Sequence, residues 1–211
     1  MKQIILIFTA LAFIGLSAQS QDNRSKFKFG IKLGSNYSNV YDTEGEEFNA
    51  DARFGFVTGA FMCIPIGEMM GVQPEILFSQ KGFKATGSLL GSTYHFTRTT
   101  SYIDVPIFFT LKPASFLTIM AGPQYSYLLQ QKDLFESGTT TIAQETEFMN
   151  DDIRKNIFGF VLGGDVNLDH FVVGGRFGFD LFKNNSDGSS TTPRYKNVWF
   201  QATLGYKFYS E

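Results

Sequence analysis

The sequence predicts an all-β fold, an eight-stranded antiparallel up-and-down transmembrane β-barrel, and three observations lead to this prediction. Eight segments alternate apolar and polar residues with a period of two, the pattern of strands whose two faces meet different surroundings. The connections between these segments alternate long and short, as they do in outer-membrane barrels. Charged residues gather on the polar face of most segments, whereas the opposite face is aliphatic and aromatic.

The composition agrees with this class and excludes several others. The chain has 211 residues, with 24 Phe and 21 Gly, which is enough for one domain. A mean hydropathy of −0.06 excludes a bundle of membrane helices but not a barrel, whose polar lumen offsets its apolar wall. The net charge of −2 gives no reason to expect nucleic acid as a partner. The single Cys63 excludes an internal disulfide and a four-cysteine metal site.

The N-terminus has the features of an export signal. Met1-Lys2 supplies a positive start, residues 4–16 are an apolar run, and the small residues Ala18 and Ser20 suit a cleavage site before Gln21. The apolar run is too short for a comfortable membrane helix. We therefore expect residues 1–20 to be a removed signal peptide and residues 21–211 to form one exported barrel domain.

The first four predicted strands cover residues 27–37, 53–64, 71–84 and 99–111. The third shows the alternation well, with Ile76 and Phe78 on one face and Glu75 and Lys81 on the other. A lysine or arginine facing lipid at the bilayer midplane costs roughly 2–4 kcal/mol, so the charged face is expected to line the lumen.

The last four predicted strands cover residues 116–130, 155–168, 171–182 and 198–208. The first of these ends with Leu129 on the lipid face and Gln130 on the lumen face. The final strand sets Phe200 and Leu204 against Gln201, and it must pair with the first strand because a sheet in lipid cannot keep an open edge. The four long connections, predicted as external loops, are residues 39–52, 85–98, 131–153 and 183–197.

Acidic and basic residues are about matched on the predicted lumen face, as a buried paired network requires. We expect a structural charge network of Glu75, Lys81, Asp104, Asp165, Arg176, Asp180 and Lys207. Arg176 is expected to lie with Asp165, Asp180 and Glu75. A proton or ion path is the alternative role for these charges. Eight strands leave an interior about wide enough for side chains, so we expect a plugged lumen without a diffusion pore.

Five segments carry a resemblance to a known family. They are FKFGIKLGSNYS at residues 27–38, VQPEILFSQKG at 72–82, YIDVPI at 102–107, AGPQY at 121–125 and LGYKF at 204–208. Together they span nearly all of the predicted mature chain, and the second and third are the most specific. The chain resembles the PorT-like outer-membrane β-barrel proteins of Bacteroidetes. This resemblance implies an eight-stranded outer-membrane barrel without a general catalytic residue, and some relatives serve a protein secretion system.

The sequence predicts a structural or interaction protein of the outer membrane, not an enzyme. His95 falls in a predicted external loop and His170 in a predicted periplasmic turn, so the two histidines cannot share a site. We expect no catalytic residue, cofactor or metal. The expected partners are outer-membrane lipid, lipopolysaccharide and other envelope proteins bound through external loops, with the protein itself a monomer. The alternatives are an exported lipocalin-like carrier of an apolar ligand and an accessory component of a protein secretion system.

Overall fold

The computed structural model describes residues 24–41, 50–89, 92–137, 140–147, 154–184 and 195–208. These residues form strands joined by short turns. The strands are Lys28–Tyr41 (β1), Ala50–Pro65 (β2), Met70–Leu89 (β3), Ser92–Ala114 (β4), Leu117–Ser137 (β5), Thr140–Glu147 (β6), Asn156–Leu168 (β7), Phe171–Asp180 (β8) and Lys196–Phe208 (β9). The predicted signal peptide, residues 1–20, lies outside the described residues.

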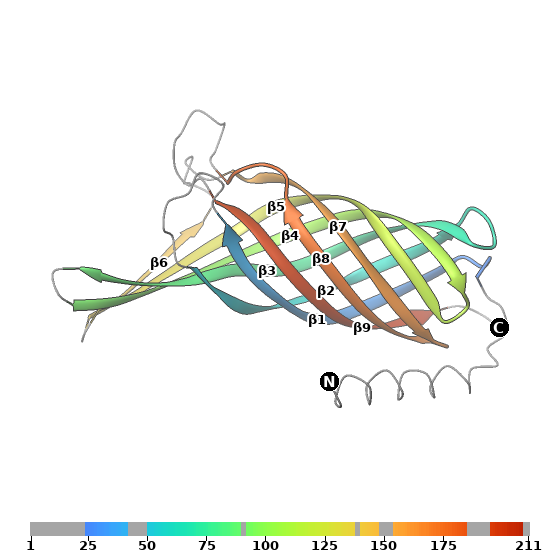
Figure 1. Cartoon of the computed structure of the whole chain (residues 1–211), viewed down its shortest axis with the longest axis horizontal. Helices are drawn as coiled ribbons and strands as arrows, with labels where there is room; N and C mark the ends of the chain where they lie inside the picture. Colours follow the sequence, from blue (N-terminus) through green and yellow to red (C-terminus); the bar gives the residue numbers. More distant parts are fainter. Residues whose placement is uncertain are drawn as a thin grey trace, which may run out of the picture.

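All the strands except β6 close into a ring, which confirms the predicted eight-stranded antiparallel barrel (Figure 1). From β1 to β6 each strand pairs with the next along the chain, β5 also pairs with β7, β8 pairs with both β7 and β9, and β9 returns to β1. The closing seam is long, running from Phe29 opposite Phe208 to Tyr41 opposite Lys196. The ring therefore has no free strand edge, as a sheet surrounded by hydrocarbon requires.

The two faces of the wall are arranged as the alternation predicts. Phe158 and Leu204 are 48% and 49% exposed on the outside, whereas Arg176 and Asp180 are 4% and 2% exposed and point inward. In β9 every second residue from Asn197 to Lys207 is buried. The apolar residues thus cover the outside of the barrel and the polar residues fill its interior, the reverse of a water-soluble barrel.

Within the described ranges, no helix has the length and apolar character that a membrane crossing needs.

The predicted external loops are wrong in part, because strands continue into all four of them and furthest into two. β3 extends to Leu89 and β4 starts at Ser92, inside the predicted loop 85–98, while β5 extends to Ser137 and pairs with β6 inside the predicted loop 131–153. Together β3, β4, β5 and β6 form an arm that projects beyond the ring, on the left of Figure 1. Outside the membrane, the backbone N–H and C=O groups of these strands form hydrogen bonds with one another. The strands need no apolar face there, so the alternation of apolar and polar residues does not predict them.

An irregularity in the pairing of β4 with β5 changes one predicted facing. The register shifts between Ser101 and Tyr102, where Ser101 pairs with Gln130 but Tyr102 pairs with Leu128. Leu128 keeps the inward phase of Gln124 and Ser126, and the extra residue that follows it in β5 turns Gln131 inward, where it is buried. The predicted inward position of Gln130 is therefore wrong, and Gln131 takes its place.

Candidate functional site

The middle of the lumen holds four charged side chains from four different strands. Arg176 of β8 donates to both carboxylate oxygens of Asp165 on β7, at 2.7 and 3.1 Å. Its Nη2 also lies 3.8 Å from Glu75 Oε1 on β3, and Lys32 Nζ of β1 lies 2.6 Å from the same oxygen. All four side chains are at most 5% exposed. Two cations thus meet two carboxylates, in a connected set that reaches across the barrel.

Neutral side chains complete this central set. Gln73 Nε2 donates to Glu75 Oε1 at 2.8 Å, and Cys63 Sγ lies 3.2 Å from Gln73 Oε1. The Arg176 guanidinium lies 5.5 Å from the centre of the Phe108 ring. Contacts of this kind add hydrogen bonds and weak attraction to the ion pairs and occupy space that water would otherwise take.

A second ion pair lies closer to the outer end of the barrel. Lys81 Nζ is 2.9 Å from Asp104 Oδ2, and both side chains are 1% exposed. The same amine lies 3.8 Å from the centre of the Trp199 ring and 4.9 Å from that of Tyr102. Trp199 is 1% exposed, so the only tryptophan points into the lumen and does not belong to an interface girdle.

Asp180 does not join Arg176, so that part of the expected cluster is wrong. Its Oδ2 instead accepts from the backbone N and the Nδ2 of Asn197 on β9, at 3.0 and 2.5 Å. The reason is spacing along one strand, because residues four apart in β8 are separated by about 13 Å. The remaining residue of the predicted network, Lys207, donates to Asn167 Oδ1 at 2.9 Å near the inner end.

The outer rim carries a charged cluster that the sequence did not indicate. Arg98 of β4 forms a two-pronged pair with Asp133 of β5, at 2.8 and 2.6 Å, and its Nη1 donates to the Tyr195 hydroxyl at 2.9 Å. The rings of Phe83 and Phe96 lie 6.0 and 5.3 Å from the guanidinium. Burial raises the pKa of Tyr195, so its hydroxyl stays protonated near neutral pH. These residues lie in or beside the predicted loops, where the alternation of apolar and polar residues does not predict which side chains point into the lumen.

The two histidines lie at opposite ends of the molecule. His95 sits on the projecting part of β4, where its Nδ1 is 3.2 Å from Thr86 Oγ1. His170 occupies the turn between β7 and β8, with its Nδ1 2.9 Å from the Lys207 carbonyl oxygen. Over the described residues, no three His, Cys, Asp or Glu side chains come together as a metal site would require.

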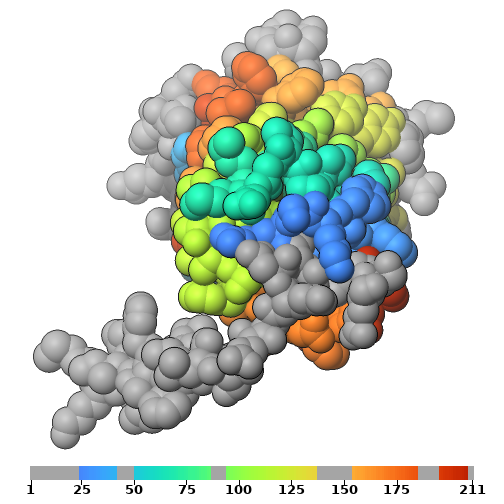
Figure 2. Space-filling view, turned by 90° about the vertical axis from the view of Figure 1, so that its right-hand side faces the viewer, coloured from blue at the N-terminus to red at the C-terminus, as the bar shows by residue number. Residues whose placement is uncertain are grey.

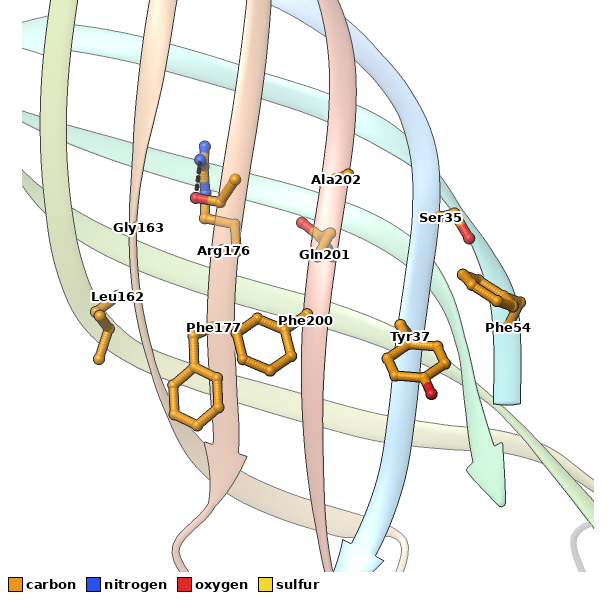
Figure 3. A pocket seen from close by; sticks show the side chains of 11 residues that line it. Ser35, Tyr37, Phe54, Leu162, Gly163, Arg176, Phe177, Phe200, Gln201 and Ala202 are labelled. Atoms are coloured by element: carbon orange, nitrogen blue, oxygen red, sulfur yellow. Dashed lines mark hydrogen bonds between the residues drawn. The ribbon is translucent and has the colours of Figure 1, made fainter. Parts of the chain in front are cut away.

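The outer wall has a groove of about 400 Å³ that follows the pairing register (Figure 3). One row of large residues crosses five strands, and its members pair in the order Leu162, Phe177, Phe200, Tyr37 and Phe54. The next row of outward-facing residues, toward the inner end, is small on four of these strands, where it pairs in the order Gly164, Gly175, Ala202 and Ser35, and it ends at Phe56 of β2. The groove lies where the small row meets the large one, and it opens on the apolar face of the wall.

Comparisons with known proteins agree with this architecture. The model of a family described as "Outer membrane protein beta-barrel domain" matches residues 18–207. No curated protein matches the chain.

Among solved structures, the attachment invasion locus protein Ail of Yersinia pestis is similar at 14% identity and a TM-score of 0.49, over 87% of this chain and 99% of Ail. Neisserial surface protein A is similar at 12% identity and a TM-score of 0.44, over 85% of this chain and 97% of the other. OprG of Pseudomonas aeruginosa is similar at 12% identity and a TM-score of 0.39, over 90% and 100%.

Proposed function

The chain belongs to the outer membrane protein β-barrel domain family, and from that premise we propose a non-enzymatic outer-membrane protein that is plugged by its own side chains. Its projecting strands, β3 to β6, are the proposed contact surface for partners outside the cell. The observation that carries the proposal is the pairing of inward charges, with Arg176, Asp165, Glu75 and Lys32 linked across the lumen. The PorT-like assignment stays a prediction.

Support for a plugged lumen comes from the large side chains that lie between the ion pairs. Trp199, Lys81, Phe108 and Met120 are among the largest fully buried residues, and all four point inward. An eight-stranded barrel has little interior space beyond what such side chains take. We expect the purified protein to give no continuous single-channel steps in planar bilayers. Sustained conductance in proportion to the amount of inserted barrel would contradict the plug.

The partner-binding part of the proposal rests on the arm. The arm carries the exposed side chains His95 and Lys132 on strand segments that pair only with other strands of the arm, which leaves its surface open to other molecules. Function in proteins with a rigid scaffold concentrates in such projecting segments. Envelope proteins and lipopolysaccharide are the proposed partners there, and acyl chains of membrane lipid are the proposed content of the groove beside Ala202.

Photo-cross-linking in intact cells tests the arm directly. A photoreactive amino acid at position 95 or 132 should capture partners, whereas the same residue at the exposed position 115, in the turn between β4 and β5, serves as the matched control. Capture of a specific protein from the arm alone supports the proposal. If positions 95 and 132 capture nothing that position 115 does not, the arm is not the contact surface.

The two alternative functions, a lipocalin-like carrier and a secretion component, require different features of the barrel. A lipocalin-like carrier needs an apolar cavity inside the barrel and a polar wall outside, and the described residues have the opposite arrangement. An accessory role in protein secretion stays a prediction of the family resemblance. It would give specific cross-links from position 115, at the inner end, because secretion partners in the periplasm reach that side.

A further inference from the structure

The groove on the outer wall is a bounded hollow in the face that meets hydrocarbon. The row of large residues that contains Phe200 borders it toward the outer end, and the row that contains Leu204 follows toward the inner end. Ile119 of β5 and Phe56 of β2 stand at the two ends of the row of small residues. A Cβ on Gly175 would meet no atom within 4 Å, so the wall leaves space there. The groove therefore has room for an apolar group from outside the wall.

The depth of the groove in the membrane follows from its place in β9. Ala202 of the groove and Lys196 at the start of β9 both lie on the outward face, since they alternate with buried residues. Six residues of strand cover about 20 Å, and a strand tilt of about 35–45° makes this about 15 Å in depth. One leaflet supplies about half of a hydrocarbon core of about 30 Å. A chain whose headgroup is level with Lys196 therefore ends at the groove.

Three cations gather above the groove, at the outer ends of β7, β8 and β9. Arg154 precedes β7, Lys183 follows β8 and Lys196 begins β9. Backbone hydrogen bonds tie the three ends together, because Arg154 N donates to Asn184 O and Asn184 N donates to Tyr195 O, each at 3.0 Å. Since Asn184 adjoins Lys183 and Tyr195 adjoins Lys196, the three cations come from one connected part of the backbone.

Two of these cations lie against apolar side chains of the wall. The Arg154 guanidinium is 5.7 Å from the centre of the Phe182 ring, and Lys196 Nζ donates to the Leu181 carbonyl oxygen at 2.8 Å. Both Phe182 and Leu181 are exposed on the outside. Asp180, the carboxylate that the structure describes at the end of β8, is buried and points into the lumen. Positive charge thus borders the apolar wall directly above the groove.

These cations can bind a phosphate while they keep their contacts within the protein. A lysine amine has three donors and an arginine guanidinium has five. The hydrogen bond to Leu181 takes one donor of Lys196. Phosphate oxygens form charge-assisted hydrogen bonds with the other donors, and these bonds are about twice as strong as neutral ones.

We propose that the outer wall binds the lipid part of lipopolysaccharide, with a phosphate at Arg154 and Lys196 and the end of an acyl chain in the groove at Ala202. The inference rests on the proposed outer-membrane function and deepens it, because it names the site and the class of lipid. The cations lie at the outer end, so the lipid belongs to the outer leaflet, where lipopolysaccharide is the phosphate-bearing lipid. An uncharged lipid would use the groove but leave the cations without a role.

A second copy of the chain fits the same groove less well. Two copies in one membrane are related by an axis along the membrane normal. The rows of residues cross the tilted strands, so such an axis makes the rows of the two copies cross at roughly 70–90°. The large row of one copy then cannot lie along the groove of the other.

The test uses the full-length protein in micelles of a neutral detergent. Diphosphoryl lipid A, phosphatase-treated lipid A and phosphatidylglycerol are added separately in equal amounts, and native mass spectrometry counts the lipid retained on each barrel. Diphosphoryl lipid A should be retained at least about fivefold more than either comparison lipid, because it alone joins phosphates to that set of chains. Equal retention of the three lipids, or preference for phosphatidylglycerol, overturns the proposal. A lipid-free dimer would assign the groove to a second copy and overturn it too.

The groove is tested by filling it. Ala202→Phe should lower the retention of diphosphoryl lipid A by at least about threefold, because the chain loses apolar contact area. Ala60→Phe is the matched control, since it adds the same ring to the outward face of β2, opposite Ile31 and away from the groove. Equal retention by the two variants would refute the groove as the site.

The cations are tested by a change of charge. Lys196→Gln should lower retention by at least about threefold, because it removes a charge-assisted hydrogen bond. Lys26→Gln is the matched control and should leave retention nearly unchanged, because residues 24–27 lie at the inner end, in blue in Figure 2. Equal retention by these two variants would refute the phosphate site. Should Lys196→Gln lose its heat-modified gel mobility, Arg154→Gln replaces it, and unchanged retention there counts equally against the proposal.

The outcome is separable from that of the proposed function. Cross-links from positions 95 and 132 report on the arm, and they do not depend on β7, β8 or β9. Loss of lipid A selectivity with intact cross-links would overturn the lipid site alone.

Discussion

At the scale of single residues, the buried cations of the central and outer lumen share one environment. Each lies between a carboxylate and an aromatic ring. Arg176 has Asp165 and Phe108, Lys32 has Glu75 and Phe61, and Lys81 has Asp104 and Trp199. The ring supplies weak attraction for the cation and also excludes water, so the ion pair acts at a low local dielectric constant. Removing one charge from such a pair leaves its partner buried without compensation.

Arg176→Met tests that statement at the most connected position. The variant leaves Asp165 and Glu75 without their shared cation, and loss of one partner of a buried pair typically costs about 3–5 kcal/mol in free energy of unfolding. Urea-induced unfolding in micelles measures the change. Adding Asp165→Asn to the same chain should restore part of the loss, because the uncompensated charge is then gone. Full stability of the single variant would show that the pair does not hold the barrel together.

The inward position of Trp199 leads to a second prediction at this scale. In bilayers containing brominated phospholipid, the fluorescence of the natural protein should be quenched little, because the ring is buried beside Lys81 and away from the acyl chains. The control combines Trp199→Phe with Phe200→Trp, which moves the tryptophan by one residue to the outer wall, where Phe200 is 59% exposed. Quenching should then be strong. Equal quenching of the two proteins would mean that the facing is wrong.

At the scale of elements, alternation alone predicts the facing of each strand but not its partners. The inward positions of Glu75, Asp165 and Arg176 follow from a period of two, whereas the contact of Glu75 with Lys32 depends on the register of three strands. The projecting arm was missed for a related reason. Its strands are held by pairing with one another, and this pairing leaves no periodic pattern in residues 131–147.

Gly82 of β3 lies in the irregular stretch of the pairing with β2, between the pairs Val57–Ser79 and Ala52–Phe83, and its backbone explains why a glycine is needed. Its φ is 147°, and a Cβ there would lie 2.0 Å from the Arg98 carbonyl oxygen. Its N and O both bond to the Ser38 hydroxyl, at 2.9 Å. Gly82→Ala should therefore lower the free energy of unfolding by about 1–3 kcal/mol in the same urea assay. Gly175→Ala, where a Cβ meets no atom within 4 Å, is the control and should leave stability nearly unchanged.

At the scale of the whole molecule, closure of the ring makes the other features possible. The seam between β1 and β9 joins the two ends of the chain into one wall, so every inward side chain faces a space bounded on all sides by sheet. Lys32 of β1 can then meet Glu75 of β3, and Gln201 of β9 can donate to Asn36 of β1 at 3.0 Å. An open sheet would leave these polar groups against hydrocarbon, at a cost of several kcal/mol for each group that lacks a partner.

Closure can be tested with a disulfide across the seam. Ser35 and Ala202 are paired in the register, and directly opposed residues of antiparallel strands have Cα atoms about 4.5–5.5 Å apart, within the range a disulfide spans. With Cys63→Ser removing the natural thiol, Ser35→Cys combined with Ala202→Cys should form a disulfide in the folded protein and raise its resistance to urea. Ser35→Cys combined with Gly175→Cys is the matched control, because β9 lies between those two positions. An open sheet, with β1 and β9 as separate edges, would leave the thiols of both variants free to alkylating reagents.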